Sequence, residues 1–457
     1  MISRRAPAVL LTALALPLAV AAAAPTITGP DPERLAIALP VRDLRAEFPD
    51  AAIFDLKDVL ARVAPGNLDT RIARSVVDAA WAERRSAVAA WWPDLTVGAL
   101  SRHTDGMLQG TFGDLGEATF ETALLGAIVR WNLNPGEIHH RGRAALEAAS
   151  AAEAGADGVL ERARAQAAAR YIELAGAVAL VGLARQTRDD AAEFLRLTRA
   201  LEEKGIAPGV DVQRARAEAA RREDSVATAE RVYRVASARL AETLDLDPAV
   251  PILPAEASLG PVDLPPPEDP EDLVALALAG RPEVRAAGRE VAAAEARLAA
   301  LRWGAFGPDV TLEVQQSALG LTFSDTGAQS IYTARLGVTL RPDQAGELRA
   351  ARARLEAARL REARARLGVR TEVVEAREAV VLSHRRLGPA REALEAAGQA
   401  LRISQVRFAS GLGSALEILQ AQDAVAAARV TAAAVLVEAG RSVTDLRRAV
   451  GIPIESM

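Results

Sequence analysis

Histidine is the side chain that most readily transfers protons or binds metals near neutral pH, and this sequence contains four histidines. His139 and His140 are adjacent, whereas His103 and His384 are distant in sequence. Adjacent residues of a helix point about 100° apart, so these two imidazoles are poorly placed to share one metal ion. No cysteine is present, which excludes disulfides, thiolate metal ligands and cysteine nucleophiles. The sequence therefore predicts no metal site and no cofactor.

Other signatures of catalysis or nucleic-acid binding are also missing. No glycine-rich phosphate loop of the Walker type occurs, and no serine or carboxylate pair has a recognisable catalytic context. The net charge of −5 and the pI of about 5.7 give no basic surface of the kind that nucleic acid requires. We expect neither an enzyme nor a nucleic-acid-binding protein.

Two carboxylates occur in matching contexts. Asp211 follows Gly205 at the same spacing at which Glu417 follows Gly411, and each lies just beyond a short turn. An acidic side chain in the first turn of a helix is stabilised by the helix dipole, and glycine suits the left-handed end of a helix. These structural roles alone would explain each glycine and the carboxylate that follows it. The glycine–turn–helix unit nevertheless occurs twice, about half the chain length apart, which indicates an internal duplication.

The first residues have the composition of a secretory signal peptide. Arg4 and Arg5 form its charged end, residues 8–20 its apolar stretch, and small residues at 22–24 its cleavage site. An uncleaved anchor is the less favoured alternative because the apolar stretch is short. No later segment approaches the roughly 20 apolar residues that a membrane-spanning helix needs, so further membrane insertion would require strands.

Short segments in both halves alternate between apolar and polar residues. One face carries Val310, Leu312, Val314, Tyr332, Ala334, Leu336, Val338 and Leu340, and in the first half Ala123, Leu125, Ala127, Val129 and Trp131. A soluble antiparallel sheet would show the same alternation. Two features favour strands that face lipid. These segments have about the ten residues needed to cross a bilayer when tilted. Tryptophans lie near the prolines that bracket the strands, as in an interfacial aromatic belt. These tryptophans are Trp91, Trp92, Trp131 and Trp303.

Long helices are predicted between the strand pairs. Residues 141–204 and 345–409 are rich in Ala, Arg, Glu and Leu, and at about 1.5 Å per residue each would span on the order of 95 Å. Two heptad series occur in the second helix, one containing Val373, Val380, Leu387, Leu394, Leu401 and Phe408, the other Leu360, Leu367, Val374 and Val381. Two adjacent seams predict neighbours on two sides, as in a closed ring of helices.

These patterns divide the chain into two repeats around a proline-rich connector. The chain is expected to begin with a signal peptide, 1–24, and an N-terminal periplasmic or equatorial segment, 25–70. The first repeat, 71–247, contains helix 71–92, a strand pair at about 94–133, long helix 141–204, turn 205–209 and helix 210–247. After the connector, 248–270, the second repeat, 271–452, contains helix 283–304, a strand pair at about 309–340, long helix 345–409, turn 410–414 and helix 415–450.

The duplication, the signal peptide and two passages resemble the TolC-type outer membrane efflux protein family, the outer membrane factors. The passages are "RPEVRAAGREVAAAEARLAALRWGAFGPDVTL" at 281–312 and "RFASGLGSALEILQAQDAV" at 407–425, and the resemblance spans about residues 50–452. It implies an α+β membrane protein that forms a homotrimer. Four strands from each chain would form one twelve-stranded β-barrel, and a long periplasmic α-helical barrel would continue from it. It implies an exit duct of a tripartite efflux or type I secretion system, with outer membrane lipid, a periplasmic adaptor protein and an inner-membrane transporter as partners.

The resemblance also assigns a place to the two turns. Both would lie at the inner end of the tube, where such proteins narrow to a gate and meet the adaptor. The candidate gate residues are then Glu417, Asp211 and Gln420, and the candidate adaptor contacts are Gly205, Pro208, Gly209, Gly411, Gly413 and Ser414. The sequence departs from the family pattern at Glu417, commonly aspartate, and at Gly413, where a basic gate-bonding residue can occur.

Two other functions remain as alternatives. A periplasmic adaptor with a helical hairpin also has long helices, but it lacks duplicated strand pairs bounded by tryptophan. A structural periplasmic coiled-coil protein would leave those strand pairs unexplained.

Overall fold

The computed structural model describes residues 35–109, 113, 115–260, 269–339, 342–410 and 412–453. They belong to one compact unit, Leu35–Met457. The expected signal peptide and the candidate tip residue Gly411 lie outside the described residues.

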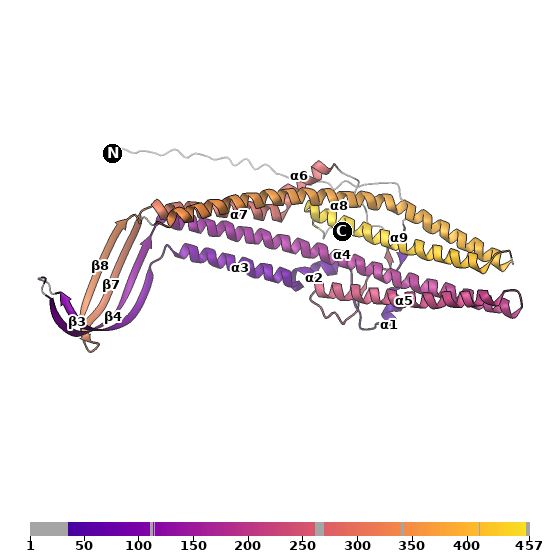
Figure 1. The fold of residues 1–457 in the computed structure, drawn as a ribbon, viewed down its shortest axis with the longest axis horizontal. Helices are drawn as coiled ribbons and strands as arrows, with labels where there is room; N and C mark the ends of the chain where they lie inside the picture. The colour runs from indigo at the N-terminus through magenta and orange to yellow at the C-terminus, as the bar shows by residue number, and fades with distance from the viewer. Residues whose placement is uncertain are drawn as a thin grey trace, which may run out of the picture. The chain divides into compact units, whose positions relative to one another are not determined.

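Four rows of helices run side by side in this unit (Figure 1). The rows are α3 (Leu68–Ala89) with α5 (Gly209–Thr243); α4 (Pro135–Glu203); α7 (Pro282–Phe306) with α9 (Ala415–Val450); and α8 (Gln344–Ala409). The second row contacts the first and third, and the third contacts the fourth. Two shorter helices therefore lie end to end beside each long one, and the first and fourth rows form the two edges of the layer.

Helix α4 begins at Pro135 rather than at residue 141, because Asn134 caps it. The Asn134 side-chain oxygen accepts a hydrogen bond from the Glu137 backbone N–H at 3.0 Å, and proline suits the first turn. Helix α3 likewise begins at Leu68, capped by Asn67, and ends at Ala89 rather than at residue 92. The other expected helices start or end within a few residues of the observed bounds.

The sheet contains four antiparallel strands in the order β3-β4-β7-β8. Their bounds are Asp94–Gln109, Leu115–Leu133, Asp309–Thr322 and Asp325–Gly337. One row of paired residues crosses all four strands and consists of Leu95, Val129, Val314 and Tyr332; the next row consists of Asp94, Arg130, Glu313 and Thr333. Directly paired residues share a face of a sheet. One face is therefore apolar in this region and the other polar, as the alternation predicts.

An ion pair strengthens the polar face where the two halves of the chain meet. Arg130 of β4 donates a hydrogen bond through Nε to Oε2 of Glu313 of β7, at 2.7 Å. Opposite charges paired across neighbouring strands favour this register over one slipped by one residue.

A smaller layer covers one side of α4. It consists of α1 (Val41–Glu47), α2 (Leu56–Gly66) and two strand pairs, β1 (Ile37–Ala38) with β6 (Ser258–Leu259) and β2 (Ala52–Phe54) with β5 (Ile252–Pro254). Leu44, Val59 and Leu253 of this layer are fully buried against Leu174 and Val178 of α4. The described parts of the N-terminal segment and of the proline-rich connector are therefore joined in one structural layer.

The expectation that no later segment is apolar enough to cross a membrane was wrong for α4. This helix contains an 18-residue window of mean hydropathy 1.5, of which 56% is buried inside the protein. Its apolar residues form the main hydrophobic cluster with the covering layer and with α5 and α9. The core of the layer accounts for this composition.

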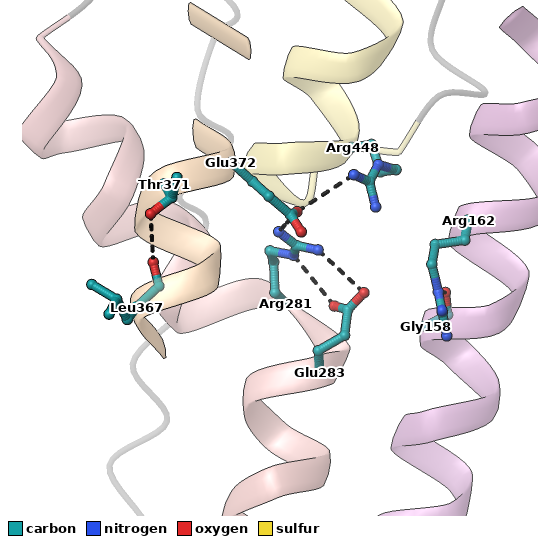
Figure 2. A network of polar contacts seen from close by, with 8 residues as sticks. All are labelled: Gly158, Arg162, Arg281, Glu283, Leu367, Thr371, Glu372 and Arg448. Atoms are coloured by element: carbon teal, nitrogen blue, oxygen red, sulfur yellow. Dashed lines mark hydrogen bonds and ion pairs between the residues drawn. The ribbon is translucent and has the colours of Figure 1, made fainter. Parts of the chain in front are cut away.

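A charge network around the buried Arg281 joins the corner between α6 (Pro270–Gly280) and α7 to α8 and α9 (Figure 2). Arg281 is only 4% exposed and contacts Glu283 at 3.2 Å and Glu372 at 2.5 Å, while Arg448 reaches Glu372 at 3.4 Å. Burial lowers the pKa of Arg281, whereas its hydrogen bonds to Glu283 and Glu372 raise it by more. The pKa of Arg281 therefore lies above its ordinary value. A buried guanidinium is tolerated only with such partners.

Candidate functional site

Both glycine turns lie at the same end of the helical layer, opposite the sheet (Figure 1). The turn between α4 and α5 forms one tip, and the turn between α8 and α9 forms the other. We call them the first tip and the second tip. The chain therefore places Asp211 and Glu417, which are far apart in sequence, at one end of the molecule.

The first tip ends α4 with a left-handed glycine. Gly205 has a φ of +73° and donates its N–H to the Glu202 carbonyl at 2.8 Å. This conformation strains any residue with a Cβ. Pro208 is the N-cap of α5 and Gly209 its first residue. The Asp211 side chain is 15% exposed and accepts a hydrogen bond from Arg214 of the same helix at 3.3 Å.

The second tip binds its carboxylate differently. Ser414 caps α9 by accepting a hydrogen bond from the Glu417 backbone N–H at 3.3 Å. The Glu417 carboxylate, with a 45% exposed side chain, lies 3.7 Å from Nε of Arg407 in the last turn of α8. Arg407 also donates to the Leu412 carbonyl at 3.3 Å, so it contacts both the turn and the returning helix.

Arg407 supplies the basic partner that Gly413 cannot. A Cβ at Gly413 would lie 3.0 Å from the Phe408 backbone nitrogen and 3.1 Å from Cβ of Arg407, which leaves little room for a side chain. Sequence reasoning missed Arg407, although a basic residue at the C-terminal end of a helix is a recognisable signal. Gln420 lies one turn beyond Glu417 and is exposed, and spacing of three residues places the two on neighbouring positions of one helix surface.

A further ion-paired cluster joins the returning helices α5 and α9 beyond the tips. Arg222 of α5 contacts Glu218 of the same helix at 2.6 Å and also pairs with Asp423 of α9. Glu218 is only 2% exposed, and its second partner is Arg221. Sequence reasoning does not find this cluster, because Asp423 lies 201 positions from Arg222 and the pairs that Glu218 forms with Arg221 and Arg222 have ordinary helical spacing.

The opposite end of the helices meets the sheet at a packed junction that contains the predicted interfacial tryptophans. Trp131 donates its indole N–H to the Trp91 carbonyl at 2.8 Å, and Trp92 is 76% exposed. The Trp303 ring packs directly on Gly136, where an added Cβ would lie 2.2 Å from ring atom Cδ2. Trp303 is thus a packing residue of this junction as well as an expected interfacial one.

The close approach at Gly136 predicts a specific defect. Gly136→Ala should destabilise the protein by about 1–3 kcal/mol, because overpacking forces the Trp303 ring or the start of α4 to move. Gly142→Ala is the matched control in the same helix, since its Cβ would lie an ordinary 3.9 Å from Val88. It should stabilise α4 by about 0.5–1 kcal/mol, because glycine weakens helix interiors. The midpoint of thermal unfolding, followed by circular dichroism, measures both; equal midpoints for the two variants would contradict the tight packing.

The histidines do not form a metal site in the part of the chain that the structure describes. The rings of His139 and His140 lie with their centroids 5.2 Å apart in an edge-to-face arrangement. Among the described residues, no group of three or more His, Cys, Asp or Glu side chains could hold a metal ion.

Comparison with known proteins identifies similar chains. The model of the outer membrane efflux protein family matches residues 61–244 and 273–452. No curated protein sequence matches significantly. The structure of the outer-membrane channel OprN is similar with a TM-score of 0.77 and 24% identity, over 92% of this chain and 94% of that one. The structure of the outer membrane protein VceC from Vibrio cholerae is similar with a TM-score of 0.75 and 19% identity, over 87% of this chain and 96% of that one. The open state of the MtrE outer membrane channel from Neisseria gonorrhoeae is similar with a TM-score of 0.73 and 18% identity, over 87% of this chain and 89% of that one.

Proposed function

Because the chain belongs to the outer membrane efflux protein family and is thus an outer membrane protein that extends into the periplasm, we propose that it is the exit duct of a tripartite efflux or type I secretion system. In this proposal it conducts substrates passively from an inner-membrane transporter to the outside. The observation that carries the proposal is the apolar row across all four strands, together with the long helices that continue from the sheet.

The sheet supports a trimer because a single chain leaves two strand edges open. Strands β3 and β8 are the outer strands of the sheet. Unpaired strand edges are not tolerated in the lipid core, so strands that span a membrane close into a barrel. Three chains would supply twelve strands, an even number of the kind found in bacterial outer membrane barrels.

The edges of the helical layer support the same assembly. On α8, Leu360, Leu367 and Val374 are 63%, 65% and 44% exposed, whereas Val373 and Val380 of the other heptad series are buried. On the opposite edge, Leu68, Ile72 and Val76 of α3 are 56%, 62% and 55% exposed. The exposed series of each edge would be covered if α8 of one chain packed against α3 of the next.

We expect Leu360→Glu combined with Leu367→Glu to abolish or strongly reduce trimers. Each substitution would place a charge in the apolar seam between helices, and burying an unpaired charge costs several kcal/mol. Size-exclusion chromatography with light scattering in detergent measures the assembly.

The control is Ala61→Glu, which adds the same side chain at an exposed position of α2, outside the two apolar series. It should leave trimers intact. Wild-type-like trimers of the double variant would show that this edge is not an interface.

The two tips are the proposed contact with the periplasmic adaptor. Pro208, Gly209, Gly413 and Ser414 lie at the end of the layer farthest from the sheet, where a partner that spans the periplasm would arrive. A photo-crosslinking residue at Ser414 or Pro208 should capture the adaptor in cells, whereas the same residue at Ala61 should not. Crosslinks at Ala61 alone would contradict a tip-to-tip arrangement.

Conductance tests the duct itself. Purified protein inserted into planar bilayers should form discrete channels, and loss of the chain should raise the sensitivity of cells to exported compounds. An adaptor protein, the alternative function, would form no channels.

A further inference from the structure

A large hollow lies on one side of the helical layer, and its lining identifies that side. Its volume is about 1040 Å³, and α3, α4, α7 and α8 all contribute lining residues. Because α3 and α8 form opposite edges of the layer, a hollow touching both lies on the concave side. The layer formed by α1, α2 and the short strand pairs packs on α4 but contributes no residue to this lining. In the trimeric tube proposed above, on which this inference rests, the concave side is the interior.

A second groove of about 580 Å³, formed by α4, α5 and α9, continues the first. Arg162 and Gln166 line both hollows, so they form one surface, which we call the arginine face. Eight arginines line it, against the four acidic residues Asp69, Glu173, Glu290 and Asp445. The local excess of positive charge is notable in a chain whose net charge is −5.

Most of this positive charge is not neutralised within the chain. Arg441 pairs with Glu173 at 2.6 Å and Arg448 with Glu372 at 3.4 Å. Arg162 donates to the backbone carbonyl of Gly158 at 3.1 Å, and Figure 2 shows its side chain lying along α4, apart from the Arg281 network. Five other guanidinium groups form no ion pair with any carboxylate in the described ranges: Arg170, Arg239, Arg297, Arg354 and Arg361.

Free guanidinium groups gathered in a concave surface attract anions. Arginine presents a planar fork of donors that matches carboxylate and phosphate groups, and such contacts are stronger than neutral hydrogen bonds. In a trimer the face would occur three times around one axis, and rings of arginine favour anions in pores. We propose that the arginine face binds anionic solutes through their carboxylate or phosphate groups as they pass along the duct.

The test is equilibrium binding to purified wild-type trimers, by isothermal titration calorimetry at low salt. Inositol hexakisphosphate probes phosphate recognition, and citrate probes carboxylate recognition. The altered protein carries Arg170→Gln, Arg239→Gln, Arg354→Gln and Arg361→Gln, none of which removes an ion pair within the described chain. We expect at least tenfold weaker binding of both probes by this variant, and weaker binding to the wild type as salt is raised.

The control is Arg45→Gln on α1, an exposed arginine of the covering layer. It should bind both probes as the wild type does. Equal binding by the fourfold variant and the wild type, or an equal loss in the control, would overturn the arginine face. Chromatography verifies that both variants remain trimeric.

The outcome also separates this inference from the proposed function. Wild-type trimers that conduct ions but bind neither probe would refute the arginine face and leave the duct in place. A protein that forms neither trimers nor channels would refute both.

Discussion

Replacing Leu312 with arginine should impair insertion of the proposed barrel, because a charge on the lipid face costs about 2–4 kcal/mol at the bilayer midplane and less towards the interface. Leu312 pairs with Ala334 and with Trp131, and thus belongs to the apolar face. Leu336→Arg is on the same face, paired with Val310 near the helical end of the strands. Because the cost falls towards the interface, we expect Leu336→Arg to have the smaller effect.

The matched controls lie on adjacent positions of the same strands. Thr311→Arg and Thr333→Arg introduce the same side chain, but Thr311 pairs with Arg335 and Thr333 with Glu313, on the polar face. An arginine there would point into the aqueous interior and should be tolerated. Heat-resistant trimers in outer membrane fractions measure assembly. If all four variants assembled equally well, the sheet would not face lipid on its apolar side.

The strand faces could be predicted from sequence because a sheet has a period of two, and a slip by one residue would expose the entire apolar set. Helix starts were harder. The α4 helix begins six residues earlier than the expected residue 141, because Asn134 caps it and Pro135 occupies its first turn. Helical periodicity locates the middle of a helix better than its ends, since caps decide the ends.

The candidate gate shows the same limit. Asp211, Glu417 and the glycines could be found because the duplication aligns them, whereas their partners could not. Arg407 and Glu417 belong to different helices, and their pairing depends on how the second tip folds. The contact of Arg222 with Asp423 joins residues about 200 positions apart in the chain and follows only from the packing of α5 near α9.

The candidate gate gives the second large expected effect. If three copies of the second tip surround one axis, three Glu417 carboxylates lie near one another at the inner end of the duct. Like charges in a confined aperture repel unless cations, donors or a partner offset them. Rings of carboxylates select cations in pores. Trimers in planar bilayers should therefore show small, cation-selective conductance that trivalent cations block from one side only.

Single substitutions should separate the contributions of the tips. Glu417→Ala should weaken both the block and the cation selectivity. Asp211→Ala should do less, because the Asp211 side chain is only 15% exposed and is paired within its own helix. The reversal potential under a salt gradient measures the cation selectivity. Titration with a trivalent cation from each side of the bilayer measures the block. The arginine face is the same in both variants, so differences between them report on the tips.

Arg407 provides the sharpest test, because the structure gives it an opposing role. Its guanidinium lies 3.7 Å from the Glu417 carboxylate and partly offsets that charge. Arg407→Ala should therefore strengthen the trivalent block and the cation selectivity, in the direction opposite to Glu417→Ala, and the double variant should resemble Glu417→Ala because no carboxylate remains to be released. Arg199→Ala, at an exposed position of α4 without an ion pair among the described residues, is the matched control. If Arg407→Ala and Glu417→Ala both left conductance and block unchanged, the constriction would lie elsewhere, and both residues would serve only to close the second tip.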